Sequence, residues 1–439
     1  MQDSHATTVP EAARTHAEDL GRFVSAAPSS YHAAAELARR AETAGFVRLA
    51  ETDAWQVAPG GRYVVVRDGS AIAFVVPPSA GPTTPFTVLG THTDSPGFKL
   101  KPQPTTGRGG WVQAGLEVYG GPLLNSWLDR ELELAGRLVT RDGAEHLVRT
   151  GPFARIPQLA IHLDRQVNDG LALDKQRHTQ PVIGLGDVSG ADVLGELTAR
   201  VDPAAGGPVD PADVLGYDVL VADTQAPRAF GARDELWASG RLDNLLSTHA
   251  ALVALLDADP DALTGVAAVA AFDHEEIGSE SRSGAAGPFL ADVLGRVSRA
   301  LGAGGEDRRR ALAASLCVSS DVGHAVHPNY PERHDPANQP QAGGGPILKI
   351  NANQRYSTDA HGAALWQEAC TAAGVPSQAF VSNNTIPCGS TIGPITATRL
   401  GIRVVDVGVP ILSMHSAREL TAVVDPWYLS RAMGAALVR

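Results

Sequence analysis

The sequence is poor in cysteine and has no apolar segment at its amino-terminal end. Only three of the 439 residues are cysteine (Cys317, Cys370 and Cys388), and no CxxC pair occurs. A disulfide framework and a thiolate zinc site are therefore both excluded, and reduced thiols lead us to expect a cytoplasmic location. The first twenty residues contain no apolar stretch of the kind found in a signal peptide.

Positive charge is also scarce. The chain has 36 Lys and Arg against 48 Asp and Glu, a formal net charge of −12, and its lysines occur only at positions 99, 101, 175 and 349. Since there is no basic stripe and no polybasic tail, we expect no nucleic-acid partner and no membrane partner. The most apolar stretch, residues 250–272, is interrupted by three aspartates and a proline, which argues against a membrane span.

Strand and helix patterns at both ends of the chain predict an α/β fold. Residues 29–46 have helical spacing and end at Gly45, residues 62–77 form two apolar runs around Asp68 and Gly69, and a short buried strand ends at His92. Later in the chain, strand-like runs alternate with helical segments such as 359–373; these runs are residues 265–272, 313–320, 347–351, 378–382 and 402–413.

The middle of the chain has a different character. Residues 111–121 and 132–150 alternate polar and apolar side chains, which is typical of antiparallel sheet with one wet face, and a loop-rich stretch covers residues 169–211. The simplest organisation is one α/β domain, residues 1–94 and 233–439, interrupted by a mostly β insertion, residues 95–232. Three consecutive small domains are the alternative. We prefer the insertion because residues with catalytic chemistry fall on both sides of it.

Polar residues cluster where the predicted strands end. Four places are strand exits and one precedes a helix, and together they supply His92, Asp243, Glu275, Glu276, Asp321 and His415. Ligands of open α/β sheets bind beyond the carboxyl ends of the strands, so these side chains are expected to converge. Two histidines with several carboxylates form a ligand set suited to Zn²⁺, Mn²⁺ or Co²⁺.

Each of these residues also has a plain structural interpretation. A single histidine after a strand is more often a hydrogen-bonded structural residue, Asp243 fits a helix N-cap, and the glutamate pair fits a solvated turn. Asp94 either orients the His92 imidazole or forms an Asx turn. Taken together, however, several unpaired carboxylates at buried strand ends would repel one another, and a bound dication compensates that repulsion.

Seven stretches resemble, in order, motifs of the M18 aminopeptidases, the aspartyl aminopeptidase family. They are THTDSP, SGRLDNLLS, FDHEEIGSES, SSDVGHAVHPNY, QRYSTDAHG, PCGSTIGP and VVDVGVPILSMHSARE. The resemblance runs from Tyr31 to the C-terminal helix. It implies a mixed-sheet, dinuclear-zinc exopeptidase domain interrupted by an inserted, mostly β dimerisation domain.

The resemblance also implies roles for single residues. Two zinc ions per chain would be held by two sets that share an aspartate: His92, Asp243 and Asp321, and Asp243, Glu276 and His415. A metal-activated water would attack the peptide bond, with Glu275 as general base and Asp94 orienting His92. Tyr356 would donate its hydroxyl to the tetrahedral intermediate, although by itself it is better interpreted as a buried structural tyrosine.

The substrate and the assembly follow from the same resemblance. Lys349 would bind the side chain of an N-terminal Asp or Glu, and its plain alternative is a lysine extending from an edge strand. The insertion would make dimer contacts, and His162 would reach the active site of a neighbouring subunit, unless it is simply a half-exposed strand histidine. Members of the family assemble as homo-oligomers, namely dodecamers built from dimers.

The sequence therefore predicts a zinc-dependent aminopeptidase that prefers peptides with an acidic N-terminal residue. A neutral-residue aminopeptidase, an amino-acid deacylase on the same dinuclear site and a non-catalytic metal-stabilised scaffold are the alternatives. The histidines at positions 324, 327 and 334 are interpreted as part of a structured loop, and Cys388 as a small packed residue.

Overall fold

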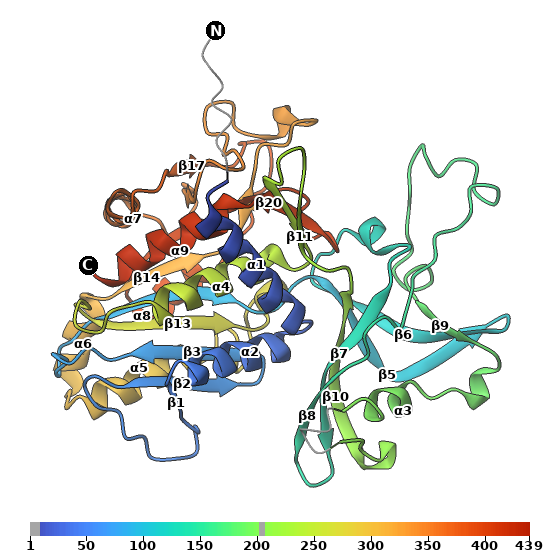
Figure 1. The fold of residues 1–439 in the computed structure, drawn as a ribbon, viewed down its shortest axis with the longest axis horizontal. Helices are drawn as coiled ribbons and strands as arrows, with labels where there is room; N and C mark the ends of the chain where they lie inside the picture. The colour runs from blue at the N-terminus through green and yellow to red at the C-terminus, as the bar shows by residue number, and fades with distance from the viewer. Residues whose placement is uncertain (1–8, 202–206) are drawn as a thin grey trace.

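The computed structural model describes residues 9–201 and 207–439, which form two large β-sheets lying side by side (Figure 1). The larger sheet has nine strands and mixed pairing. In spatial order its strands are β1 (Val47–Arg48), β2 (Arg62–Arg67), β3 (Ser70–Val75), β13 (Val266–Phe272), β4 (Phe86–His92), β14 (Leu316–Ser320), β18 (Arg403–Gly408), β16 (Ile347–Lys349) and β17 (Gln378–Phe380).

Helices cover both faces of the nine-stranded sheet because side chains along its strands alternate between two cores. In β13, Ala267 and Val269 join one core while Ala268 and Ala270 join the other, as the period of two in a strand requires. The first core receives α1 (Glu11–Ala26), α2 (Ser30–Thr43), α4 (Leu242–Leu256), α7 (Ala360–Ala373) and α9 (Val424–Leu437). The second receives α5 (Phe289–Ala300), α6 (Gly305–Ala313) and α8 (Ile392–Leu400).

The centre of this sheet brings four carboxyl-terminal strand ends to one edge. Strand β4 is parallel to β13 and β14, and β14 is parallel to β18. The register places Phe272 opposite His92 and Ser319 opposite Gly90. Residues that follow these strands therefore emerge side by side, which is the condition for a common site.

The second sheet is antiparallel and has six strands, all taken from residues 97–223. In spatial order they are β8 (Glu145–Arg149), β7 (Leu132–Thr140), β10 (Val214–Asp223), β5 (Gly97–Arg108), β6 (Trp111–Tyr119) and β9 (Val182–Leu185). The sheet has an apolar core of its own, which includes Phe98, Leu134 and Val219. The short helix α3 (Val193–Thr198) packs on this sheet.

Smaller elements complete the fold. A three-stranded sheet contains β11 (Arg228–Phe230), β12 (Leu236–Ser239) and β20 (Glu419–Ala422), and a two-stranded sheet pairs β15 (Gly323–His324) with β19 (Pro410–Ile411). Among the residues described, no helix has both the length and the apolar character needed to cross a membrane.

The predicted mixed α/β fold is confirmed, with local corrections. The predicted strand 402–413 is two strands, β18 and β19, which belong to different sheets. Pro410 has no N–H to continue the first ladder. The predicted strand 313–320 begins three residues later, at Leu316, because Ala313 still belongs to α6. The loop-rich stretch 169–211 contains β9 and α3, which are too short to leave a clear periodic pattern.

Candidate metal centre

The six residues predicted as ligands and base lie together at the carboxyl edge of the nine-stranded sheet. His92 ends β4, Asp321 directly follows β14, and Glu275 and Glu276 lie in a short 3₁₀ turn after β13. Asp243 is the second residue of α4, and His415 lies between β19 and β20. The parallel register of β13, β4 and β14 therefore brings three separate strand exits into one cluster.

Two triads of ligand atoms meet at Asp243. The Nε2 atom of His92 lies 3.3 Å from Asp243 Oδ1 and 3.5 Å from Asp321 Oδ1. The Nε2 atom of His415 lies 3.4 Å from Asp243 Oδ2 and 3.6 Å from Glu276 Oε2. Two ligands that each lie about 2.0–2.1 Å from a tetrahedral zinc ion are roughly 3.4 Å apart. The separations thus fit a metal in each triad, with one Asp243 oxygen for each.

Buried carboxylate oxygens without partners support the same fit. Among the described residues, Asp243 Oδ1 and Glu276 Oε1 are buried and accept no hydrogen bond. An unpaired buried carboxylate oxygen is costly, and a cation removes that cost. The N-cap interpretation of Asp243 is wrong, because Arg241 occupies the N-cap position of α4 and Asp243 is the second residue inside the helix.

Both histidines are oriented through their second ring nitrogen. The Nδ1 atom of His92 lies 3.1 Å from the carbonyl oxygen of Asp94 and 3.5 Å from its carboxylate Oδ1, so the carbonyl is the nearer acceptor. The Nδ1 atom of His415 lies 3.0 Å from the carbonyl oxygen of Gly121. Such contacts fix each imidazole ring so that its Nε2 atom faces the carboxylate oxygens of its own triad.

The Asp94 carboxylate holds the glutamate pair by its backbone. Oδ1 accepts the N–H of Glu275 at 3.0 Å, and Oδ2 accepts the N–H of Glu276 at 3.2 Å. Oδ2 also accepts the hydroxyl of Tyr119 at 2.7 Å, and burial raises the pKa of that phenol. The last residue of β6 thus reaches the site from the six-stranded sheet.

The Glu419 carboxylate holds the backbone of two predicted ligands. Its Oε2 accepts the N–H of Asp243 at 3.0 Å, and its Oε1 accepts the N–H of His415 at 2.8 Å. Burial, followed by the nearby charge of Asp243, raises the pKa of Glu419 to about 8. Sequence reasoning missed Glu419, Tyr119 and Gly121. The only sequence signal was for Glu419, which lies four residues after His415 in the motif MHSARE.

The electrostatics show an excess of negative charge. Burial and the neighbouring carboxylates raise the pKa of Glu275 to about 7 and that of Glu276 well above its usual value. Burial by itself would lower the pKa of His92, but contacts with Asp243 and Asp321 raise it well above the usual value. A group of carboxylates that resists full ionisation is the environment that a bound dication stabilises.

Lys349 is a buried neighbour of the centre. Only 2% of the residue is exposed, and its Nζ donates to the Val322 carbonyl at 2.8 Å and to Asp321 Oδ2 at 3.3 Å. Strand β16 lies between β18 and β17, so the interpretation of Lys349 as a lysine on an edge strand is wrong. The ammonium also lies 5.3 Å from the centre of the Tyr356 ring.

Tyr356 lines a pocket of about 330 Å³, and its ring places this pocket near the Lys349 ammonium, although Lys349 and the predicted metal ligands are not part of the lining. The lining includes His324, Arg333 and Cys388 but no Asp or Glu from the described residues. Burial raises the pKa of Tyr356, whose hydroxyl contacts the Cys388 thiol. The structured-loop interpretation of the three histidines agrees with two contacts: His334 Nε2 accepts the N–H of His327 at 3.0 Å, and His327 Nδ1 accepts that of Asn329 at 3.2 Å.

His162 is the one predicted site residue that the fold keeps apart from this cluster within the chain. It is exposed in a turn of the segment between β8 and β9, two strands of the six-stranded sheet. The neighbours Leu159, Ile161 and Leu163 are exposed as well.

The sequence matches the family model described as "Aminopeptidase I zinc metalloprotease (M18)" over residues 23–433. A Streptomyces avermitilis protein named "Probable M18 family aminopeptidase 2" is 55% identical over 430 residues, which cover 97% of this chain and 98% of that protein. A Mycobacterium leprae protein with the same name is 42% identical over 428 residues, covering 95% and 97%.

Solved structures have the same fold. A chain in the cryo-EM structure of the Ape4 and Nbr1 complex gives a TM-score of 0.94 at 36% identity, over 98% of this chain and 88% of that one. The S. cerevisiae mApe1 dodecamer gives 0.81 at 28% identity, over 96% of each chain. An M18 aminopeptidase from Thermotoga maritima gives 0.84 at 26% identity, over 99% of this chain and 97% of that one.

Proposed function

This chain belongs to the M18 family of zinc metalloproteases, and from that premise we propose which residues carry out its reaction and which substrates it prefers. As a member it is a metallo-aminopeptidase, which hydrolyses peptide bonds. We propose two zinc ions per chain and a preference for N-terminal Asp or Glu. One observation carries the proposal: two triads of metal-ligating atoms share the carboxylate of Asp243.

The proposed ligands are those of the two triads, His92, Asp243 and Asp321 for one ion, and Asp243, Glu276 and His415 for the other. When bound, zinc supplies Lewis acidity that polarises a carbonyl and makes water a stronger acid; Mn²⁺ and Co²⁺ suit the same ligand types. Asp94, Gly121 and Glu419 keep the ligands aimed through the hydrogen bonds described above.

Glu275 is the proposed general base. It is not needed in either triad, yet a carboxylate oxygen of Glu275 lies within ligand distance of His92 and Glu276. Its backbone N–H is fixed on Asp94, which positions the residue. Its carboxylate would take a proton from the attacking water and pass that proton to the leaving amine. Tyr356 would donate its hydroxyl to the oxyanion of the tetrahedral intermediate from the wall of the adjacent pocket.

Two features support an acidic substrate. A lysine ammonium has three N–H donors, and Lys349 uses two of them on Val322 and Asp321; the third donor of this buried ammonium is the one we propose for a substrate carboxylate. The neighbouring pocket of about 330 Å³ has no acidic residue in its described lining, whereas Arg333 and three histidines border it. An anionic side chain meets no like charge there.

We also propose that residues 95–232 form a dimerisation domain and that the chain assembles as a homo-oligomer, a dodecamer built from dimers. Leu159, Ile161, Leu163 and Leu171 are between 40% and 74% exposed along one loop, and exposed apolar side chains gathered in this way mark interaction sites. A structural relative is a dodecamer. His162 lies between two of these residues and would enter a neighbouring active site. The three free cysteines fit the cytoplasm.

Metal analysis combined with substrate comparison tests the proposal. We expect about two zinc equivalents per chain by elemental analysis, and a higher kcat/KM on Asp- and Glu-anilides than on Leu- and Lys-anilides. A preference for Leu would favour the neutral-residue aminopeptidase, hydrolysis of acyl amino acids would favour the deacylase, and full metal without hydrolysis would favour the scaffold. One equivalent or none would contradict the dinuclear site.

A further inference from the structure

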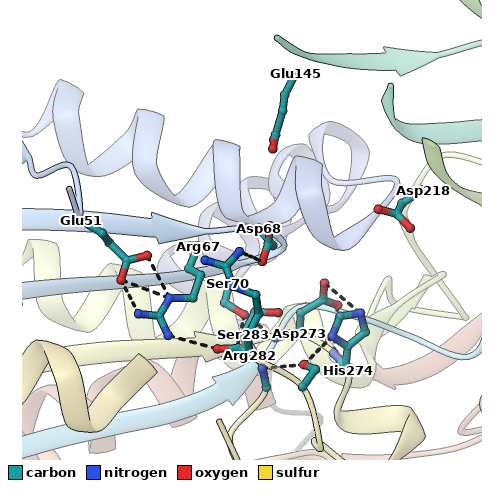
Figure 2. A network of polar contacts seen from close by, with 12 residues as sticks. Glu51, Arg67, Asp68, Ser70, Glu145, Asp218, Asp273, His274, Arg282 and Ser283 are labelled. Carbon is teal, nitrogen blue, oxygen red and sulfur yellow. Dashed lines mark hydrogen bonds and ion pairs between the residues drawn. The ribbon is translucent and has the colours of Figure 1, made fainter. Parts of the chain in front are cut away.

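The turn between β2 and β3 lies where the two large sheets and the loop after β13 meet (Figure 2). The carboxylate of Asp68, in this turn, joins two arginines. Its Oδ1 accepts from Arg137 Nη1 at 2.8 Å, and its Oδ2 accepts from Arg282 Nη1 at 2.7 Å. Arg137 belongs to β7 of the six-stranded sheet, whereas Arg282 belongs to the loop that also contains Glu275 and Glu276. One side chain therefore bridges the two parts.

The connection to the six-stranded sheet is held on several sides. Arg137 Nε donates to Asp218 Oδ2 on β10 at 3.1 Å, and Lys99 Nζ on β5 donates to Asp218 Oδ1 at 2.7 Å. The Arg137 guanidinium also stacks 4.5 Å from the centre of the Tyr31 ring. The side chains of Arg137 and Asp68 are each only 16% exposed, so their ion pair is less screened than a surface pair.

The connection to the loop after β13 holds the loop at its first residue and again about ten residues later. The hydroxyl of Ser70 accepts the N–H of Asp273 at 2.7 Å and donates to the carbonyl of Ser283 at 2.9 Å. Arg67 Nη1 adds a bond to the carbonyl of Arg282 at 3.1 Å. Asp273 precedes Glu275 by two residues, so a shift of the turn displaces the start of the segment that carries the glutamate pair.

The β2–β3 turn also contacts the residues that follow β4, and it is tightly packed there. The carbonyl of Gly69 accepts the hydroxyl of Thr93 at 2.6 Å, next to Asp94, whose carboxylate holds the glutamate N–H groups. A Cβ atom at Gly69 would lie 2.1 Å from Asp273 Oδ2 and 2.7 Å from Ser30 Oγ. The turn therefore packs directly against the segment it positions.

We propose that Asp68 is a positioning residue that couples the six-stranded sheet to Glu275 and Glu276. The inference rests on the proposed role of Glu275 as the base. The competing explanation is local: Asp68 has a φ of 54°, and Asp is one of the few side chains that tolerate this left-handed conformation. Asparagine tolerates it equally well but cannot pair with two arginines, so Asp68→Asn separates the two explanations.

The experiment compares Asp68→Asn, Arg137→Met and the double variant with the wild-type enzyme, well below the melting temperature. We expect each single variant to lower kcat by about 10- to 100-fold through misplacement of the base, with KM and zinc content unchanged. The double variant should lose no more than either single one, because both break the same link. Glu145→Gln is the matched control: Glu145 also contacts Arg137, at 3.3 Å, but is 59% exposed and does not reach the turn, so kcat should stay at the wild-type value.

Wild-type kcat in a folded Asp68→Asn enzyme, or losses that multiply in the double variant, would overturn the proposal. If Asp68→Asn fails to fold, Arg282→Met answers the question, because that side chain is 69% exposed and its removal breaks only the connection to the loop. Its kcat should also fall, and an unchanged kcat there refutes the coupling. A wild-type enzyme without peptidase activity would refute the proposed function instead, so the two failures are distinguishable.

Discussion

The two adjacent glutamates after β13 are expected to fail in different ways when each becomes glutamine. Glu276 belongs to a triad with Asp243 and His415, whereas Glu275 belongs to neither of the two triads that share Asp243. Glu276→Gln should therefore lower the zinc content from about two equivalents to about one. Glu275→Gln should retain both metals and lower kcat by about 10²- to 10⁴-fold, or roughly 3–5 kcal/mol in activation free energy.

The buried charge of Glu275 also affects the stability of the metal-free protein. Burial raises the pKa of Glu275 from 4.5 to about 7, so in metal-free protein the ionised carboxylate lowers the free energy of unfolding. This destabilisation is complete above pH 7 and disappears below about pH 4, where the carboxyl group is protonated in both the folded and the unfolded state. A shift of about 2.5 units corresponds to about 3 kcal/mol at most. Metal-free Glu275→Gln should therefore unfold at a higher urea concentration than metal-free wild type at pH 8, and the difference should vanish near pH 4.

The assays are zinc analysis, steady-state kinetics on an acidic anilide and urea unfolding of the metal-stripped proteins. The two variants serve as controls for each other, because they remove the same charge one residue apart. Loss of zinc from Glu275→Gln, or retention of wild-type kcat, would refute the assignment of the base. Two full equivalents of zinc in Glu276→Gln would refute its assignment as a ligand.

Three further outcomes are expected. Gly69→Ala should lower the free energy of unfolding by about 1–3 kcal/mol in urea titrations, because its Cβ would lie 2.1 Å from Asp273 Oδ2; an unchanged midpoint would contradict the tight packing. Burial lowers the pKa of His16 to about 3, so the free energy of unfolding should fall by up to about 5 kcal/mol as pH drops from 6.5 towards 3, and His16→Gln should flatten that slope. Lys349→Met should reduce kcat/KM for Asp-anilide more than for Leu-anilide, since the Leu substrate reports only the lost contact with Asp321; equal losses would remove Lys349 from substrate selection.

Much of the fold could be predicted because its signals are local. Apolar runs with turn residues between them indicated β2, β3, β4 and β13, and helical spacing with a glycine stop indicated α2. The strand 402–413 was predicted as one strand because apolar character continues through Leu412, whereas Pro410 cannot extend the first ladder and β19 pairs with β15 instead. The hydrophobic pattern of a segment predicts which residues are buried, but it does not predict which sheet the segment joins.

The candidate ligands and base were visible in the sequence because their residue types are unusual at the ends of buried strands. The supporting residues were not visible. Tyr119 reaches Asp94 from β6, Gly121 holds His415 from 294 residues away, and Asp68 meets Arg137 and Arg282 across 69 and 214 residues. Their roles depend on how the two sheets lie against each other.

The sequence by itself therefore determined the fold class and the family, and it pointed to the candidate metal ligands. Only the tertiary structure decided that Lys349 is buried against Asp321, that Asp243 caps no helix and that the β2–β3 turn joins both sheets to the glutamate loop. The physical reason is that periodicity and residue chemistry act over a few neighbouring positions. Contacts between distant side chains, in contrast, are set by the packing and register of whole strands.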